Sequence, residues 1–152
     1  MYKEPFVTKD EAKWLMETLR NIQFFSIFSL ENIDSVLKLF QKYTYPKGKS
    51  IIIEGESGKA FFVVHTGKVK VFKRKVFWMK QQLALLGPGD FFGEMALVSE
   101  EPAAASIVPV ESTEAFVLLK SDFQSILKSN PKLGDEIRRI AEKRKFENLK
   151  RN

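Results

Sequence analysis

Residues 89–106 read GDFFGEMALVSEEPAAAS, and the rest of the chain is best understood from this stretch. It runs from a Gly-Asp turn through two phenylalanines to Gly93 and Glu94, which open a short apolar segment, and it ends in a proline and small residues. A glycine that leads into a short helix leaves backbone N–H groups without partners in the helix, beside the positive end of the helix dipole. The stretch therefore predicts a seat for an anion such as a phosphate.

The order of residues in this stretch follows a known sequence motif. The run FGEMAL at 92–97 is followed, after a short insert, by Pro102 and by AASI at 104–107. It resembles the phosphate-binding cassette of the cyclic-nucleotide-binding domain family, of the catabolite-activator and protein kinase A regulatory-subunit type. The family's usual wording is Phe-Gly-Glu-x-Ala-Leu, then Pro-Arg-x-Ala-(Thr/Ser)-(Val/Ile). Ala103 stands where the family has the arginine that grips the cyclic phosphate.

The resemblance implies a site for cyclic AMP or cyclic GMP. Glu94 would bond the ribose 2′-hydroxyl, backbone N–H groups near Ala104 would bind the phosphate, and the Ser106 hydroxyl would touch the phosphate or the purine. The alternatives are that Glu94 only stabilises the first turn of a helix and that Ser106 is a strand residue facing outward. The predicted ligand-binding residues are Gly93, Glu94, Met95, Ala96, Ala103, Ala104 and Ser106.

Ala103 lowers the affinity that the resemblance would otherwise predict. A guanidinium makes two charge-assisted hydrogen bonds to one phosphate, each contributing about 1.5–3 kcal/mol, so its loss lowers affinity by about a hundredfold or more. Glu100 and Glu101 would repel an anion unless they point to solvent. Lys73, in a predicted strand, is a candidate substitute cation, and the alternative is a lysine at an exposed strand end.

Short β-rich runs, punctuated by glycine and proline, follow Tyr45. They predict an antiparallel β-roll, a double-stranded jelly-roll-like barrel of about eight strands that spans residues 45–119. The side chains of Leu83 and Leu85 are expected in the barrel core rather than against a base. The predicted strands cover residues 50–53, 60–65, 68–72, 82–86 and 114–119.

Helices are predicted on both sides of the roll, so the fold class is mainly β with flanking helices. Residues 9–20 and 30–43 carry apolar side chains at helical spacing, which predicts two amphipathic helices. Ser121 is expected to cap a short helix. Pro131 is expected to open a last helix that runs to about Leu149.

The chain is expected to divide into an N-terminal helical lead-in over 1–44, the roll with its cassette over 45–120, and C-terminal helices over 121–152. The last helix has a thin apolar face that needs a cover. We therefore expect it to form a homodimer, to contact a partner protein or to dock on the roll. This face consists of Ile137, Ile140, Ala141, Arg144 and Leu149.

The composition excludes several function classes. The chain has 152 residues and 44% apolar content, which is enough for one globular domain with a single core. With no cysteine and one histidine, it cannot form disulfides, a thiolate site or a multi-histidine metal centre. That histidine, His65, precedes the Thr66-Gly67 turn and has no catalytic partner recognisable in the sequence, and no paired-carboxylate motif is visible. We therefore predict neither a catalytic residue nor a metal site.

The net charge of +6 raises the question of nucleic-acid binding. The basic residues gather near the C-terminus and in the predicted strands at 68–80, where we interpret them as solvated faces, because no recognition-helix pattern accompanies them. No specific DNA binding is therefore expected. No run approaches 18 apolar residues, so no membrane span is predicted, and a cytoplasmic location is expected.

The predicted function is a cyclic-nucleotide-binding regulatory or sensor module of weak affinity. No effector domain of its own is expected, because the chain ends at Asn152. The alternative is a degenerate, ligand-independent domain of the same fold that acts as a protein interaction or oligomerisation module. Beyond the cAMP or cGMP ligand, no cofactor is predicted.

Overall fold

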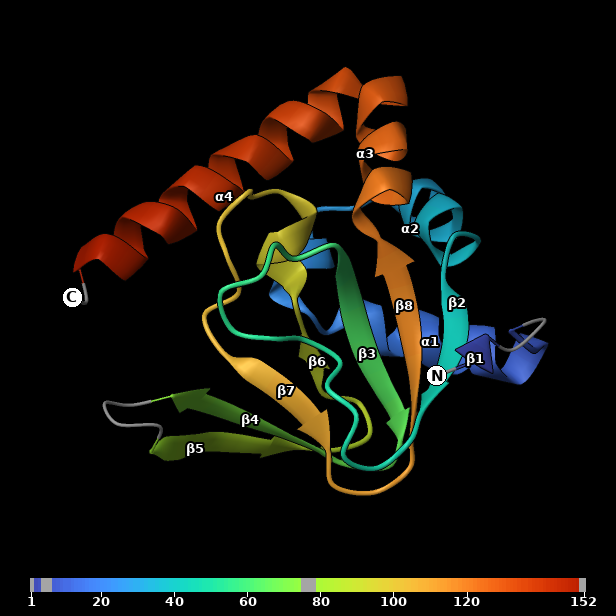
Figure 1. Cartoon of the computed structure of the whole chain (residues 1–152). Coiled ribbons are helices and arrows are strands. Elements are labelled where there is room, and N and C mark those ends of the chain that lie inside the picture. The colour runs from blue at the N-terminus through green and yellow to red at the C-terminus, as the bar shows by residue number, and fades with distance from the viewer. Residues whose placement is uncertain (1, 4–6, 75–78, 151–152) are drawn as a thin grey trace.

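Two antiparallel sheets form the body of the protein in a computed structural model, which describes residues 2–3, 7–74 and 79–150, with side chains described from Val7 to Lys143 (Figure 1). The strands are β1 (Tyr2–Lys3), β2 (Gln41–Tyr45), β3 (Ala60–Thr66), β4 (Val69–Arg74), β5 (Lys80–Leu86), β6 (Phe91–Phe92), β7 (Ser106–Pro109) and β8 (Thr113–Leu119). One sheet has the order β1-β2-β8-β3-β6 and the other β5-β4-β7. The predicted β-roll is confirmed, although its sheets do not close into a barrel.

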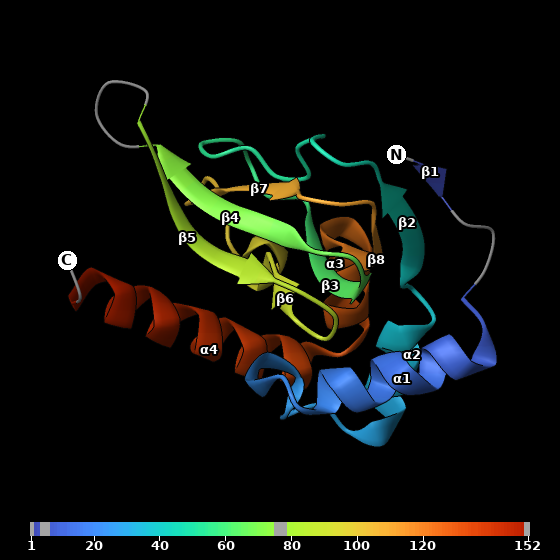
Figure 2. The same ribbon diagram turned by 90° about the horizontal axis from the view of Figure 1, so that it is seen from below.

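Helices precede and follow the roll in sequence, as predicted, and in space they cover one side of the larger sheet (Figures 1 and 2). Their bounds are α1 (Lys9–Arg20), α2 (Leu30–Leu37), α3 (Lys120–Ser129) and α4 (Pro131–Lys150), with short 3₁₀ turns η1 (Gln23–Phe25) and η3 (Glu94–Leu97). α1 starts at a capping box, in which Thr8 Oγ1 accepts from the Glu11 N–H at 3.1 Å and Glu11 Oε1 accepts from the Thr8 N–H at 2.9 Å. None of the described helices is both long and apolar enough to cross a lipid bilayer.

Strands β3 and β8 are buried on both faces. Their side chains alternate, so one set points to the helices and the other to the space between the sheets. The register places Val63 opposite Phe116 and Val64 opposite Ala115, which keeps residues of one set side by side. The set that faces the helices is Phe61, Val63, Phe116 and Leu118, and the set inside the roll is Phe62, Val64, Ala115 and Val117.

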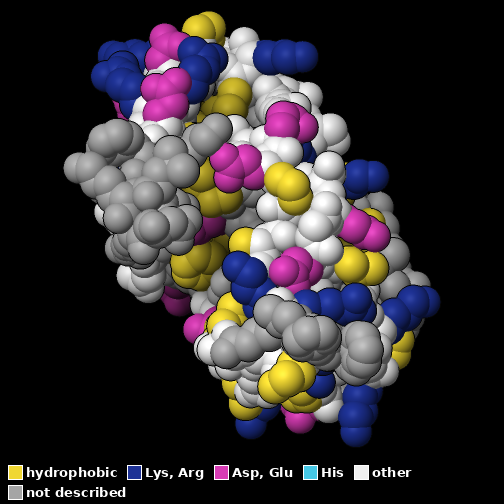
Figure 3. Space-filling view, turned by 60° about the vertical axis from the view of Figure 1, so that its left-hand side comes forward, with side chains coloured by type: hydrophobic (Ala, Val, Ile, Leu, Met, Phe, Trp, Pro, Cys, Tyr) yellow, Lys and Arg dark blue, Asp and Glu magenta, His cyan; other side chains and the backbone are white. Residues whose placement is uncertain are grey.

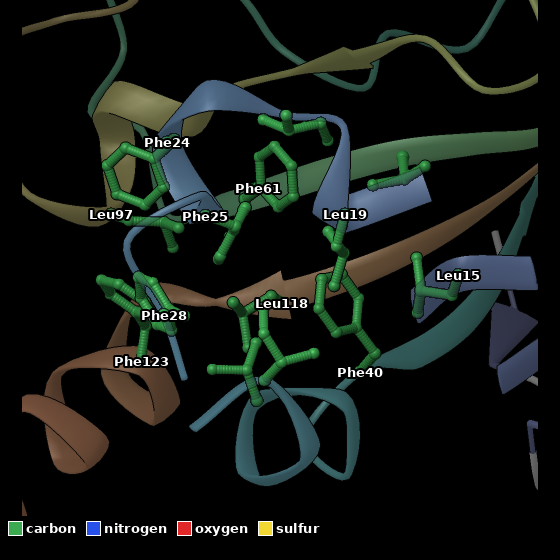
Figure 4. Packing of buried hydrophobic residues seen from close by; sticks show 14 of the residues in the cluster. Leu15, Leu19, Phe24, Phe25, Phe28, Phe40, Phe61, Leu97, Leu118 and Phe123 are labelled. Carbon is green, nitrogen blue, oxygen red and sulfur yellow. The ribbon is translucent and has the colours of Figure 1, made fainter. Parts of the chain in front are cut away.

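The helical side of the core is rich in aromatic rings (Figure 4). The Phe25 ring lies 5.4 Å from Phe61 of β3, and Phe28 lies 6.2 Å from Phe123 of α3, measured between ring centroids. Such pairs add about 0.5–1.5 kcal/mol each to the burial of their area. Leu97 of η3 is fully buried in the same cluster, so the 89–106 stretch is anchored in this core.

The first half of α4 docks on this core. Leu133 and Ile137 are buried in it. The Asn130 side chain donates to Oδ1 of Asn32 on α2 at 3.0 Å, which ties the corner between α3 and α4 to the N-terminal helices. The predicted docking of the last helix is therefore observed for the face at Ile137, whereas the side chain of Leu149 lies outside those described.

Three predicted elements differ from the structure. The helix expected over 30–43 ends at Leu37, because residues 41–45 pair with five residues of β8 as strand β2. The strand expected over 50–53 is reduced to an isolated bridge between Ile52 and Ile107. α3 starts at Lys120, and Ser121 therefore lies inside the helix rather than at its cap.

The expected burial of Leu83 and Leu85 is also wrong. Each side chain is 51% exposed, because β5 is an edge strand of the smaller sheet and projects from the body beside β4 (Figure 2). The basic residues of this hairpin lie mostly at the surface, as expected for a solvated face. Lys70 and Lys80 place their ammonium groups 5.6 Å and 5.0 Å from the centre of the Phe72 ring.

A cluster of charges fastens α1 to the larger sheet. Lys42 Nζ on β2 lies 2.9 Å from Glu11 Oε2, and these side chains are only 14% and 13% exposed. Burial raises the pKa of Glu11, but the hydrogen bonds from Thr8 and Lys42 outweigh it, and the pKa lies below its ordinary value. The ionised form of Glu11 is therefore favoured by folding.

We expect Glu11→Gln to lower the free energy of unfolding at pH 7 by about 1.5–3 kcal/mol, because a charge-assisted hydrogen bond and a helix cap are weakened. The pKa of Glu11 is depressed in the folded state, so this stability is present above about pH 4.5 and is lost as the pH falls through the lower folded value. Urea denaturation of both proteins from pH 7 to pH 3 measures the difference. Asp34→Asn is the control, because its pair with Lys38 is exposed. An equal effect of the two substitutions would contradict this account.

Candidate functional site

A cavity of about 880 Å³ lies between the 89–106 stretch and α4. Its volume falls within the range of about 300–1,000 Å³ that is usual for small-molecule sites. Figure 3 looks at this side of the molecule, where hydrophobic side chains lie in a recess beside acidic ones. The lining residues are Ile52, Gly58, Gly93, Glu94, Met95, Ala96, Val98, Ser99, Glu100, Glu101, Pro102, Ala103, Ala104, Ala105, Ile107, Arg138, Ala141 and Glu142.

Gly93 sets the direction in which the chain enters the cavity wall. Its φ is +82°, in the left-handed region, and a Cβ at this position would lie 2.7 Å from the carbonyl oxygen of Ala60 on β3. Both facts require glycine. The 3₁₀ turn that follows holds Glu94 at the cavity, with the Oε2 atom of its carboxylate buried.

The second half of the stretch is held by backbone pairing. The N–H of Ala103 donates to the carbonyl of Glu56 at 2.8 Å, and the N–H of Gly55 donates to the carbonyl of Ala103 at 2.9 Å. The polar backbone groups of Ala103 are thus already used, and the residue brings no polar side chain to the cavity. An anion here must be held by other groups.

The charges around the cavity are mostly negative. Glu94, Glu100, Glu101 and Glu142 line it, whereas Arg138 is the sole cation among the described lining residues. Glu100 is 88% exposed and is bonded by Lys120, whose Nζ lies 2.8 Å from the carboxylate and 2.8 Å from the carbonyl of Ser99. This ion pair reduces the repulsion that the sequence predicted from Glu100.

Residues 42–130 match the family model of the cyclic nucleotide-binding domain. The chain belongs to the cyclic nucleotide-binding domain family. It is similar to the cyclic AMP receptor protein of Thermus thermophilus, with 37% identity over 114 residues that cover 75% of this chain and 53% of that protein. The chain spans about half the length of the first curated relatives that it matches.

Solved structures of the family show the same fold. A structure of cAMP-bound PfPKA-R superposes with a TM-score of 0.75 and 26% identity, covering 82% of this chain and 43% of that one. A cyclic nucleotide-binding domain from Methylobacillus flagellatus gives a TM-score of 0.71 and 27% identity, covering 91% of this chain and 80% of that one. The 89–106 stretch lies within the residues that match the family model.

The cavity brings the predicted ligand-binding residues together, with the exception of Ser106. That residue is buried, and its hydroxyl accepts a hydrogen bond from the N–H of Glu54 at 2.9 Å instead of lining the cavity. It holds the 50–54 segment against β7. The residues that do line the cavity are Gly93, Glu94, Met95, Ala96, Ala103 and Ala104.

The residues by which α4 lines the cavity were not predicted from the sequence. Arg138, Ala141 and Glu142 are spaced i, i+3, i+4 and so lie on one face of the helix, toward the cavity. Lys73, the substitute cation considered from the sequence, is exposed on β4 and does not line the cavity. The helical spacing of these residues can be recognised in the sequence, but the sequence of α4 alone does not show which face of the helix lies toward the cassette.

The described residues contain one group of possible metal ligands, at the opposite end of β3 from Gly93. Atoms of Glu11, His65 and Glu114 lie within 4.8 Å of one another. His65 Nδ1 lies 2.6 Å from Glu114 Oε1, so the histidine has an acidic partner that is distant in sequence. Because Lys42 already places its ammonium 2.9 Å from Glu11, this group reads as an ion-pair cluster rather than a cation site.

We expect Gly93→Ala to lower the free energy of unfolding by about 1–3 kcal/mol, because alanine is strained at this φ and its methyl group meets the Ala60 carbonyl. Thermal unfolding measures the loss. Gly87→Ala is the matched control, since its added methyl group meets nothing within 4 Å. A Gly93→Ala protein as stable as the control would show that this turn does not hold the cavity wall.

Proposed function

We propose that this cavity binds a cyclic nucleotide, cAMP or cGMP, and that the chain is a regulatory or sensor module rather than an enzyme. One observation carries the proposal: most of the residues that match the family's cassette pattern line a single cavity of suitable size, and α4 forms its other wall. These residues are Gly93, Glu94, Ala96, Pro102, Ala105 and Ile107. The chemistry of each wall fits one part of such a ligand.

The sugar and the phosphate would lie against η3. The Glu94 carboxylate would accept hydrogen bonds from ribose hydroxyls, and a carboxylate with one buried oxygen is well placed for this. The N–H groups that begin a helical turn have no partner within the turn and would donate to phosphate oxygens. Without an arginine at Ala103, we expect a dissociation constant of about 10–100 μM or weaker.

The output would pass through α4. This helix forms one wall of the cavity, while Ile137 anchors it in the core, so a ligand in the cavity would act on the helix directly. Ile140 remains partly exposed and does not line the cavity, and it is part of the surface through which we propose a homodimer or a partner contact. No specific DNA contact is proposed, and the cytoplasmic location stays a prediction.

A ligand-independent interaction module is the second candidate. The observation that favours it is the charge of the cavity lining, which has four glutamates, one of them paired with Lys120, and one arginine, while Ala103 contributes no polar side chain. Such a lining repels an anion unless a cation is placed on it. This reading predicts the same fold and no response to nucleotide.

We expect Ala103→Arg to strengthen cAMP binding by about 1.5–3 kcal/mol, or about tenfold to a hundredfold, because it restores the forked phosphate contact. Glu94→Gln should weaken binding, because an ionised acceptor for the ribose hydroxyls is replaced by a neutral one. Calorimetric titration with cAMP and cGMP measures both effects. Glu111→Gln, an exposed change of equal charge that lies outside the cavity, should leave affinity unchanged. If neither the unmodified chain nor Ala103→Arg binds either nucleotide, the interaction-module reading is correct.

A further inference from the structure

The cavity needs a positive charge if it is to hold a cyclic phosphate, and the described lining offers one. Arg138 is that charge, against the four carboxylates of Glu94, Glu100, Glu101 and Glu142. The phosphate of a cyclic nucleotide gains nothing from these carboxylates, although Lys120 pairs with that of Glu100, so the guanidinium is the lining group that can attract the phosphate. The inference drawn from it rests on the proposed function.

Arg138 reaches the cavity from a helix whose rotation is fixed. Ile137, the preceding residue, is 1% exposed in the core, so the helix cannot turn without exposing it. Ala141 and Glu142, one turn later, line the same cavity. The Arg138 side chain therefore starts from a backbone position held beside the cassette, while its own end is free to move because the side chain is 70% exposed.

The present partner of Arg138 can be exchanged. Its Nη1 atom lies 3.0 Å from Oδ1 of Asp135, and that carboxylate is 61% exposed. Asp135 borders a second cavity of about 520 Å³, and Arg138 borders both cavities. Exposed ion pairs of this kind are weak, so the guanidinium can leave Asp135 for a stronger acceptor at little cost.

We propose that Arg138 grips the ligand phosphate from α4 and so replaces the arginine that the cassette lacks at Ala103. In the empty protein the guanidinium rests on Asp135. When a cyclic nucleotide enters, the guanidinium turns into the larger cavity and makes charge-assisted hydrogen bonds to the phosphate. Ala103 and Ala104 have small side chains, which leave space for the guanidinium beside the phosphate seat.

The first test compares Arg138→Gln with Arg139→Gln. Arg139 is the neighbouring exposed arginine and lines neither cavity, so the two variants have the same net charge. Titration with cAMP, followed by NMR up to millimolar ligand, should show affinity at least about tenfold weaker for Arg138→Gln and unchanged for Arg139→Gln. Adenosine, which lacks the phosphate, should bind both variants and the unmodified chain alike. Arg138→Lys should retain part of the cAMP affinity, because it keeps the charge but not the fork.

The second test uses the two neighbours of the guanidinium. Asp135→Asn frees Arg138 from its competing partner and should strengthen cAMP binding by about twofold to fivefold. In an Ala103→Arg background, the loss caused by Arg138→Gln should shrink, because both guanidinium groups then serve one phosphate.

The outcomes separate this inference from the proposed function. Equal cAMP affinities for the unmodified chain and Arg138→Gln overturn the inference and leave the proposed function standing. Binding by Ala103→Arg alone, with none by the unmodified chain, overturns both, because the cavity of the unmodified chain then holds no nucleotide and Arg138 does not replace the missing arginine. No binding by any of these proteins overturns both. Equal thermal unfolding of Arg138→Gln and Arg139→Gln shows that a difference in affinity does not come from the fold.

Discussion

The architecture depends on one pair of strands, β3 and β8, that are covered on both faces. Each strand presents alternate side chains to the helical core and to the interior of the roll, so a slip of one residue would exchange the two sets. The side chains that face the helices are mostly bulky, either aromatic or leucine, whereas those inside the roll are mostly smaller. The register therefore determines where the helices pack and how far apart the sheets lie.

The position of the cavity wall depends on strand β3 of this pair and on the helical core beside it. Ala60, at the start of β3, presents the carbonyl that leaves room only for glycine at position 93, and Leu97 inserts into the helical core on the other side of the same turn. The cassette is thus held between the two cores, by Phe92 on one side and Leu97 on the other. The same aromatic core anchors Ile137, which places α4 across from the cassette. The packing of the helical core therefore fixes the positions of both walls of the cavity.

Local patterns predicted most of this fold. The apolar run 60–64, the glycine turns and the FGEMAL motif each predict their local structure from a few residues, because turn geometry and side-chain alternation are local properties. The failures are non-local. The helix predicted over 30–43 includes residues 41–43, but residues 41–45 form a strand because β8 offers five pairing partners. Leu83 was predicted to be a core residue, yet its strand lies at the edge of a sheet and the side chain is exposed. Arg138 was predicted to belong to a solvated basic face. It lies far from the cassette in sequence, but α4 places it beside the same cavity.

A phosphate grip on a helix has a different consequence from one in a loop. An arginine within the cassette would hold the phosphate whether or not α4 was in place. A grip from Arg138 contributes binding free energy only while α4 lies against the roll, so the ligand favours the docked helix by the same free energy that the docked helix adds to ligand binding. Asp135 sets the resting state of this coupling, because it holds the guanidinium when the phosphate is absent. If Arg138 grips the phosphate as proposed, a weaker affinity caused by Ala103 and a coupling through α4 have one cause, which is that the cation stands on the helix and not in the cassette.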